Sequence, residues 1–179
     1  TGTTISFKAD PEIFDTTVFD KKTLERRFRE MAFLNSGVQI IFEDKRDNST
    51  QSFKYDGGLR EFVTYLNRNK DAIMTEVPHF LGTQEETGIE IAFQYTDSYN
   101  ENILTFANNI LTPEGGTHLS GFRSALTRGI NDYARKYKMI KDNEENLQGE
   151  DVREGMTAIV SVKISNPQFE GQTKAKLGN

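Results

Sequence analysis

The sequence predicts an α+β fold in which helices and strands form a two-layer sandwich around one core. Strand-like and helical patterns alternate along its 179 residues, which is enough chain for one domain with its own core. The strongest strand signal is the apolar run from Met156 to Ile164, which indicates a strand buried on both faces. The strongest helix signal begins near Thr117, where apolar residues recur every three or four positions.

The N-terminal segment predicts a strand followed by a domain boundary. From Thr1 to Asp10, apolar and polar residues alternate, as they do in a half-buried strand. Pro11 then interrupts the pattern, because proline cannot donate a hydrogen bond to a strand ladder. We therefore expect residues 1–11 to form a strand separate from the main domain, which spans residues 12–179.

A helix, a hairpin and a second helix are expected next. Asp20 is a suitable N-cap for a helix from about Lys21 to Leu34. Residues 38–43 and 50–55 predict the hairpin. The apolar sides of the two helices are Leu24, Phe28, Met31 and Ala32 in the first, and Leu59, Phe62, Val63 and Leu66 in the second.

Further strands are expected before the central helix. Pro78 would be costly in a central strand, so the extended segment at residues 73–81 belongs at an edge. Alternation from Ile89 to Tyr95 predicts a half-buried strand. After a turn, residues 102–108 are expected to return as its hairpin partner.

The central helix is expected to carry the core of the domain. Gly115 and Gly116 lead into it, and Thr117 is a candidate N-cap. Residues 141–154 then form an acid-rich loop. The apolar face of the helix consists of Leu119, Phe122, Leu126, Ile130, Tyr133 and Tyr137.

Composition narrows the possible functions. The formal net charge of -5 argues against a generally basic nucleic-acid-binding surface, so any DNA contact must be local. Cysteine is absent and only His79 and His118 offer imidazoles, so we expect no metal site. No long apolar run occurs and Thr1 does not open a signal peptide, so a soluble protein without membrane association is expected.

The chain ends in a polar stretch whose chemistry suits a phosphate. Pro167 and Gly171 punctuate the backbone and predict a loop that presents Gln172, Thr173 and Lys174. An ammonium is a compact charge for a terminal phosphoryl group, and a nearby amide can donate to its oxygens or orient an attacking water. A solvated polar tail accounts for the same residues without any function.

Three blocks of sequence resemble the B subunit of bacterial DNA gyrase. Residues 169–179 resemble the QTK loop of that family, residues 114–128 resemble its GGTH segment and the following helix, and residues 149–163 form the third block. Three ordered blocks are more specific than one short motif. The resemblance covers nearly the whole chain, but the sequence contains neither the ATP-binding domain of that family nor its tyrosine-containing cleavage domain.

The resemblance implies that residues 12–179 are the transducer domain of the ATPase half, with a ribosomal S-five domain-two-like fold. Residues 1–11 would be the last strand of the missing ATP-binding domain. It also implies a fragment of a bacterial, cytoplasmic, ATP-dependent type II DNA topoisomerase, an isomerase, that is inactive as an isolated chain. ATP and Mg²⁺ would be bound mainly by the missing domain, so no cofactor is expected here. The implied partners are DNA, the ATPase domain on the same polypeptide, a second copy of the gyrase B chain and the gyrase A chain.

The resemblance also implies roles for individual residues. Lys174 and Gln172 are expected to act catalytically on the γ-phosphate of ATP, and Thr173 to join them in contacting the nucleotide. Arg123 is the candidate for a DNA phosphate contact inside the cavity that captures a DNA segment; a surface arginine paired with an acid is the alternative. His118, near the helix start, is expected to be structural.

The function implied by the resemblance is to couple ATP binding and hydrolysis to DNA strand passage and negative supercoiling. The loop at residues 172–174 would sense the γ-phosphate. Two alternatives stay open at this point. One is the corresponding ATPase chain of topoisomerase IV, which decatenates DNA, and the other is a non-catalytic nucleic-acid-binding or scaffold module with the same fold.

Overall fold

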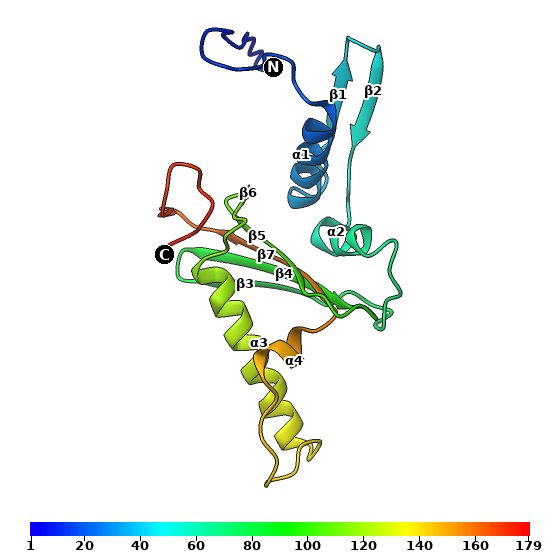
Figure 1. Ribbon diagram of the computed structural model, residues 1–179, viewed down its shortest axis with the longest axis vertical. Helices are drawn as coiled ribbons and strands as arrows, with labels where there is room; N and C mark the ends of the chain where they lie inside the picture. The colour runs from blue at the N-terminus through cyan, green and yellow to red at the C-terminus, as the bar shows by residue number, and fades with distance from the viewer.

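A five-stranded sheet forms the middle of the structure, with helices on both of its faces (Figure 1). The computed structural model describes residues 1–179. The strand order is β3-β4-β7-β5-β6, and only the β5–β7 pair is parallel. These strands are β3 (His79–Gln84), β4 (Thr87–Tyr95), β5 (Asn102–Ala107), β6 (Ile110–Leu111) and β7 (Met156–Lys163).

Strand β7 occupies the central position of the sheet. It pairs antiparallel with β4 and parallel with β5, and every residue from Met156 to Val162 is buried. A strand that has neighbours on both edges and helices on both faces is shielded from water, which is why its sequence is apolar almost throughout. The predicted burial of this strand on both faces is confirmed.

The expected hairpin between residues 89–95 and 102–108 is wrong. Both segments are strands, but β7 lies between β4 and β5 and separates them. Strand β4 instead forms a hairpin with β3 through the turn at Glu85 and Glu86. Strands adjacent in the sequence often pair, but here the most apolar strand takes the centre of the sheet. Strand β3 lies at the edge that Pro78 predicts.

Helix α1 (Lys21–Leu34) has the predicted bounds and the predicted cap. The Asp20 carboxylate accepts a hydrogen bond of 2.7 Å from the backbone N–H of Thr23. The expected apolar side is partly wrong, because Met31 is exposed whereas Phe33 is fully buried. Burial in α1 is concentrated at its C-terminal end, where the helix meets α2 and the core.

Strands β1 (Ile40–Asp44) and β2 (Ser49–Phe53) form the predicted hairpin, separate from the main sheet. Helix α2 (Gly58–Leu66) follows, also as predicted. The ring of Phe33 in α1 stacks on that of Phe62 in α2, with centroids 4.6 Å apart. Together with residues of β4, β5 and β7, these rings form the largest core cluster.

Helix α3 (Thr117–Lys136) covers the face of the sheet opposite α1 and α2 (Figure 1). Along β7, Ala158 and Val160 pack with Phe122 of α3, whereas Ile159 packs with the α1–α2 cluster, as the two-residue period of a strand requires. The α+β class is confirmed. The sheet and α3 form the two expected layers, and α1 with α2 adds a third.

The expectation that Tyr133 and Tyr137 belong to the core is wrong. Each is 55% exposed, and their rings pack against each other with centroids 4.4 Å apart. Helix α3 extends beyond the sheet (Figure 1), so its last turns have no strands beneath them. The helical spacing of these tyrosines is therefore real, but their face of the helix meets solvent there.

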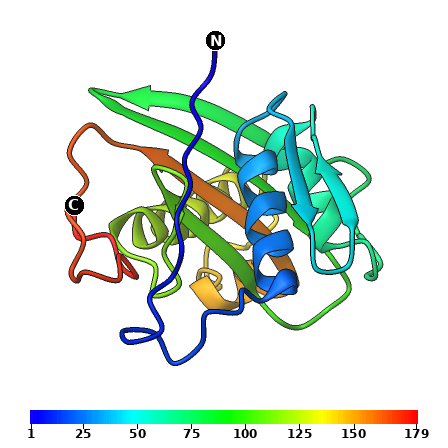
Figure 2. The ribbon, with the colours of Figure 1, turned by 90° about the horizontal axis from the view of Figure 1, so that it is seen from above.

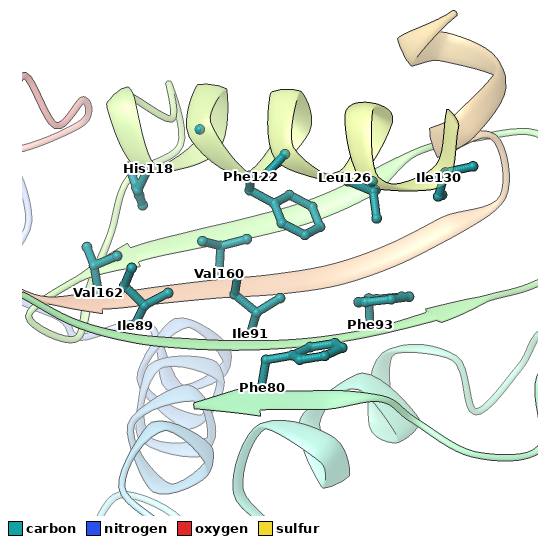
Figure 3. Close-up of a pocket in the computed structure, with 13 residues that line it drawn as sticks. Phe80, Ile89, Ile91, Phe93, His118, Phe122, Leu126, Ile130, Val160 and Val162 are labelled. Atoms are coloured by element: carbon teal, nitrogen blue, oxygen red, sulfur yellow. The ribbon is translucent and has the colours of Figure 1, made fainter. Parts of the chain in front are cut away.

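A cavity of about 660 Å³ lies between α3 and the sheet (Figure 3). Its walls are mainly apolar, so the apolar face of α3 does point toward the sheet but does not fill the space completely. Helix α3 contributes His118, Phe122, Leu126 and Ile130, and the strands contribute Phe80, Ile89, Ile91, Phe93, Val160 and Val162.

The expected strand at Thr1–Asp10 is absent, because no strand precedes α1 in the structure. Ile5 and Phe7 are 83% and 79% exposed. In Figure 2 this segment crosses the molecule as an extended chain without joining a sheet. A strand requires a neighbour for its backbone hydrogen bonds, and this segment has none here.

The acid-rich segment at residues 141–154 is not entirely a loop, because it contains the short helix α4 (Gly149–Arg153). A capping box starts this helix: the backbone N–H of Gln148 donates to the Asp151 carboxylate over 2.8 Å. Helix α4 leads directly into β7. Neither this helix nor any other in the chain combines the length and apolarity needed to cross a membrane.

Candidate functional site

The segment after β7 returns on itself as a loop whose tip carries the three predicted residues. Gln172 and Thr173 are the central residues of a turn, closed by a 3.0 Å hydrogen bond from the backbone N–H of Lys174 to the carbonyl of Gly171. Lys174 has a φ of 55°, a left-handed conformation that is uncommon for a residue with a side chain. All three side chains are exposed.

Backbone hydrogen bonds hold the stem of this loop. The N–H of Glu170 donates to the carbonyl of Lys176 over 3.0 Å, and the N–H of Gly178 donates to the carbonyl of Gln168 over 2.7 Å. The tip is therefore held out from the domain on a braced stem, which a freely solvated tail would not have. The loop predicted from Pro167 and Gly171 is present.

Leu177 joins the loop to the start of α3. Its side chain is 1% exposed and packs with residues of β5 and β7. Its backbone N–H donates to the carbonyl of Gly115 over 3.0 Å, and its carbonyl accepts from the N–H of Thr117 over 3.2 Å. A Cβ atom on Gly116 would lie 2.2 Å from the Leu177 carbonyl oxygen, so only glycine fits between them. Two distant blocks of sequence thus form one structural unit.

The expectation that Thr117 caps α3 is wrong. Gly116 occupies the N-cap position with a φ of 137°, and Thr117 is the first helical residue. The Thr117 hydroxyl donates instead to the backbone carbonyl of Asn179 over 2.6 Å. Its side chain therefore ties the start of the helix to the base of the loop.

The two lysines of the loop differ in their surroundings. The ammonium of Lys176 pairs with the Glu170 carboxylate at 3.0 Å. Lys174 makes no ion pair, and its ammonium lies 5.9 Å from the centroid of the Phe169 ring. A charge that no carboxylate neutralises is free to meet an incoming anion.

Arg123 is paired with an acid, as in the alternative interpretation of this residue. Glu101, just before β5, bonds Arg123 of α3 through one carboxylate oxygen and Arg153 of α4 through the other, the latter at 2.7 Å. Partial burial alone would raise the pKa of the Glu101 carboxyl, but hydrogen bonds from the two guanidiniums outweigh it and hold that pKa below its usual value.

A polar groove of about 510 Å³ adjoins this Arg–Glu–Arg cluster. Arg123 and Arg153 both line it, whereas Glu101 does not. Three of its ten lining residues are arginines, and only one, Asp132, is an acid. The groove is therefore locally cationic on a chain whose net charge is negative.

His118 lies half-buried on the first turn of α3. Its Nε2 is 3.1 Å from the Thr112 hydroxyl, and its Nδ1 is buried without a hydrogen-bond partner. Burial lowers the pKa of the imidazole, which favours the neutral ring. These contacts fit the structural role expected for this residue.

The sequence reasoning missed several residues that build the two sites. Leu177 carried a signal, because it is an apolar residue in an otherwise polar segment. Glu101 and Arg153 carried no such signal in the sequence, because they lie 52 positions apart and meet only in the folded chain. No three His, Cys, Asp or Glu side chains gather where they could hold a metal ion.

The same fold occurs in known ATPase domains. The ATP-binding domain of topoisomerase IV from Francisella tularensis aligns with 95% of this chain and 45% of its own, with a TM-score of 0.77 and 23% identity. The 43K ATPase domain of gyrase B from Thermus thermophilus aligns with 95% of this chain and 46% of its own, with a TM-score of 0.81 and 40% identity. The fold is thus of the class found in the ATPase domains of gyrase and topoisomerase IV.

Sequence similarity narrows this class. Residues 58–179 match the family described as DNA gyrase B. The B subunit of DNA gyrase from Clostridium acetobutylicum is 58% identical over 179 residues, which are 99% of this chain and 28% of the relative. The chain belongs to the DNA gyrase B family, and it spans little more than a quarter of the length of the curated relatives it matches.

Proposed function

We propose that this chain is the transducer domain of a gyrase B protein, and that it couples ATP binding and hydrolysis in a neighbouring domain to DNA strand passage and negative supercoiling. Residues 12–179 form the transducer, and residues 1–11 belong to the preceding ATP-binding domain. Membership of the gyrase B family supports supercoiling over the decatenation carried out by topoisomerase IV.

The observation that carries this proposal is the presentation of Lys174. It stands exposed and without an ion pair at the tip of a braced loop, next to Gln172 and Thr173. The tip offers an ammonium, an amide and a hydroxyl, and none of these groups makes a hydrogen bond or an ion pair within the chain. These donors suit the oxygens of a terminal phosphate, so the loop fits the γ-phosphate of ATP held by another domain.

Each loop residue has a distinct role in this mechanism. Lys174 neutralises charge on the phosphoryl group as it transfers, and Gln172 and Thr173 donate hydrogen bonds to it. ATP and Mg²⁺ are bound mainly by the ATP-binding domain and supply the reacting phosphoryl group and its counter-charge. Charge-assisted hydrogen bonds contribute about 1.5–3 kcal/mol each, which is enough to bias the angle between two domains.

The contact between Leu177 and the start of α3 connects the loop to the rest of the domain. Leu177 is bonded to the backbone on both sides of Gly116, so a pull on the loop tip acts on the start of α3. Helix α3 packs on β7 through Phe122. Docking of the loop on a phosphate is therefore converted into a movement of the whole domain.

DNA is the proposed partner of helix α3, which connects the loop to the cationic groove. Arg123 lies on α3, fewer than two turns from Thr117, and lines the cationic groove. Such a side chain contacts DNA phosphates without reading sequence. The remaining partners are a second copy of the gyrase B chain, whose transducer closes the cavity around the DNA segment, and the gyrase A chain, in the bacterial cytoplasm.

Substitution of the two loop lysines tests this proposal in the complete parent protein. We expect Lys174→Ala to lower kcat for ATP by roughly 100-fold or more, the cost of removing one positioned charge from a transition state. Lys176→Ala is the matched control, because it removes the same charge from the same loop. We expect it to change kcat less than about threefold, since Lys176 is already paired at the surface.

Thermal unfolding separates catalysis from folding. Both variants should unfold within about 0.5 kcal/mol of the parent, because both side chains are at the surface. Equal and mild decreases in kcat at the two positions would show that the loop is a solvated tail without a role in catalysis. A fall in turnover matched by unfolding would make Lys174 a structural residue.

A further inference from the structure

We infer that Arg153 is a second phosphate-binding residue beside Arg123, and that Glu101 is an internal counter-charge that keeps the DNA affinity of this pair low. The inference rests on the proposed function, because it deepens the role of the groove that Arg123 lines. It concerns how firmly the domain holds DNA, and it adds two residues to that site.

Three elements converge to build this cluster. Glu101 comes from the segment before β5, Arg123 from α3 and Arg153 from α4. The Glu101 side chain is 25% exposed and the Arg153 side chain 14%, so this arrangement is held by the fold more firmly than a free surface pair. A single carboxylate therefore sets the position of two guanidiniums at once.

Both arginines retain donors for another anion. A guanidinium has five N–H groups, and in this cluster Glu101 engages Arg153 through Nε and Arg123 through Nη2. The Arg123 guanidinium makes no other hydrogen bond, and neither does the Arg153 guanidinium. Both side chains line the groove while Glu101 does not, so an anion in the groove meets the arginines from the side that Glu101 leaves open.

The charge of the cluster limits how tightly it binds. Two guanidiniums and one carboxylate carry a net charge of about +1 in place of +2, because the pKa of Glu101 is held low and the acid stays ionised. A domain that guides a DNA segment through a cavity must also release it. A built-in counter-charge lowers the affinity while it keeps the two arginines in place.

Substitution of Glu101 in the complete gyrase provides the test. The probe is linear double-stranded DNA, and the readout is the DNA concentration that gives half-maximal stimulation of ATP turnover, measured over a series of salt concentrations. We expect Glu101→Gln, which retains the shape of the side chain but removes its charge, to lower that concentration by roughly three- to fivefold, the scale of a partly exposed charge pair. Inorganic phosphate should compete with DNA more effectively in this variant.

Two arginine variants complete the design. Arg123→Gln and Arg153→Gln should each raise the half-saturating DNA concentration and each lower the slope of log affinity against log salt by about one. If Arg123→Gln changes neither quantity, the DNA role in the proposed function fails. If it changes both but Arg153→Gln changes neither, or Glu101→Gln leaves DNA affinity unchanged or weaker, the inference is wrong and the proposed function stands.

Thermal unfolding serves as the control for all three variants. A variant of Glu101 that unfolds at the assay temperature leaves the arginine slopes as the deciding measurement. In that case an unchanged salt slope in Arg153→Gln overturns the inference, and a slope reduced by about one supports it.

Discussion

The imidazole of His118 shows how a single side chain can couple stability to pH. It is half-buried on the first turn of α3 and lines the apolar cavity shown in Figure 3. Its Nε2 lies beside the Thr112 hydroxyl, and its Nδ1 has no partner. Burial lowers its pKa below the ordinary 6.5, because a charged ring would lose its hydration there.

We expect this histidine to make the chain less stable at acidic pH. The unfolded chain binds a proton near pH 6.5, whereas the folded chain resists that proton until a lower pH. The free energy of unfolding should therefore fall as the pH drops below about 6.5 and stay level above it. Urea unfolding from pH 5 to pH 8 measures this pH dependence of the free energy of unfolding.

The control for this prediction is His118→Gln, which keeps a hydrogen-bonding group near Thr112 but does not titrate. It should lose the part of the pH dependence that lies below about 6.5. Identical pH profiles for the two proteins would assign the acid sensitivity to other groups.

At the scale of elements, the junction between the C-terminal loop and α3 decides whether the loop is positioned. The loop contributes Leu177 and the helix start contributes Gly115, Gly116 and Thr117. Gly116 has a φ of 137°, and the close approach of the Leu177 carbonyl leaves no space for a side chain. A backbone conformation of this kind is accessible to glycine but strained for other residues.

We expect Gly116→Ala to break this junction. The added methyl group would overlap the Leu177 carbonyl, so the variant should lose roughly 1–3 kcal/mol of stability and most of the ATP turnover of the parent protein. Hydrogen exchange at the Leu177 amide, which bonds Gly115, should accelerate. Urea unfolding, turnover and exchange provide the three measurements.

Gly121→Ala is the matched control for this substitution. Gly121 lies in α3, and a Cβ there would meet no atom within 4 Å. Because alanine favours a helix over glycine by about 1 kcal/mol, this variant should be neutral or slightly more stable. If Gly116→Ala behaves like Gly121→Ala, the junction does not position the loop.

At the scale of the whole molecule, the loop tip is presented to solvent and so depends on another domain. Lys174 is exposed, and water competes with any phosphate that approaches it. A charge contributes strongly to catalysis only in a site that excludes water. In the proposed function, this chain supplies one wall of an active site, and the ATP-binding domain supplies the other walls.

We therefore expect the isolated chain to fold but not to hydrolyse ATP. Its turnover should match that of its own Lys174→Ala variant, and turnover should return when the ATP-binding domain is present on the same polypeptide. Phosphate release by the purified chain measures this. Activity that survives removal of contaminants and disappears in Lys174→Ala would show that the chain is catalytic alone.

The sequence by itself determined most elements and the chemical character of the loop. Helix α1 begins where Asp20 predicts, because a cap and a helical period are local properties. The burial of β7 on both faces follows from its apolar composition. The exposed Gln172-Thr173-Lys174 tip follows from turn residues on either side.

Only the tertiary structure decided which segments meet. The expected hairpin of residues 89–95 and 102–108 fails because β7, far along the chain, takes the place between them. The absent strand at Thr1–Asp10 and the exposed Tyr133 have the same origin, since a periodic pattern does not reveal whether a partner lies beside it. Long-range packing also decides two contacts that a local pattern cannot encode. These are the packing of Leu177 against Gly116 and the hydrogen bond between Glu101 and Arg153.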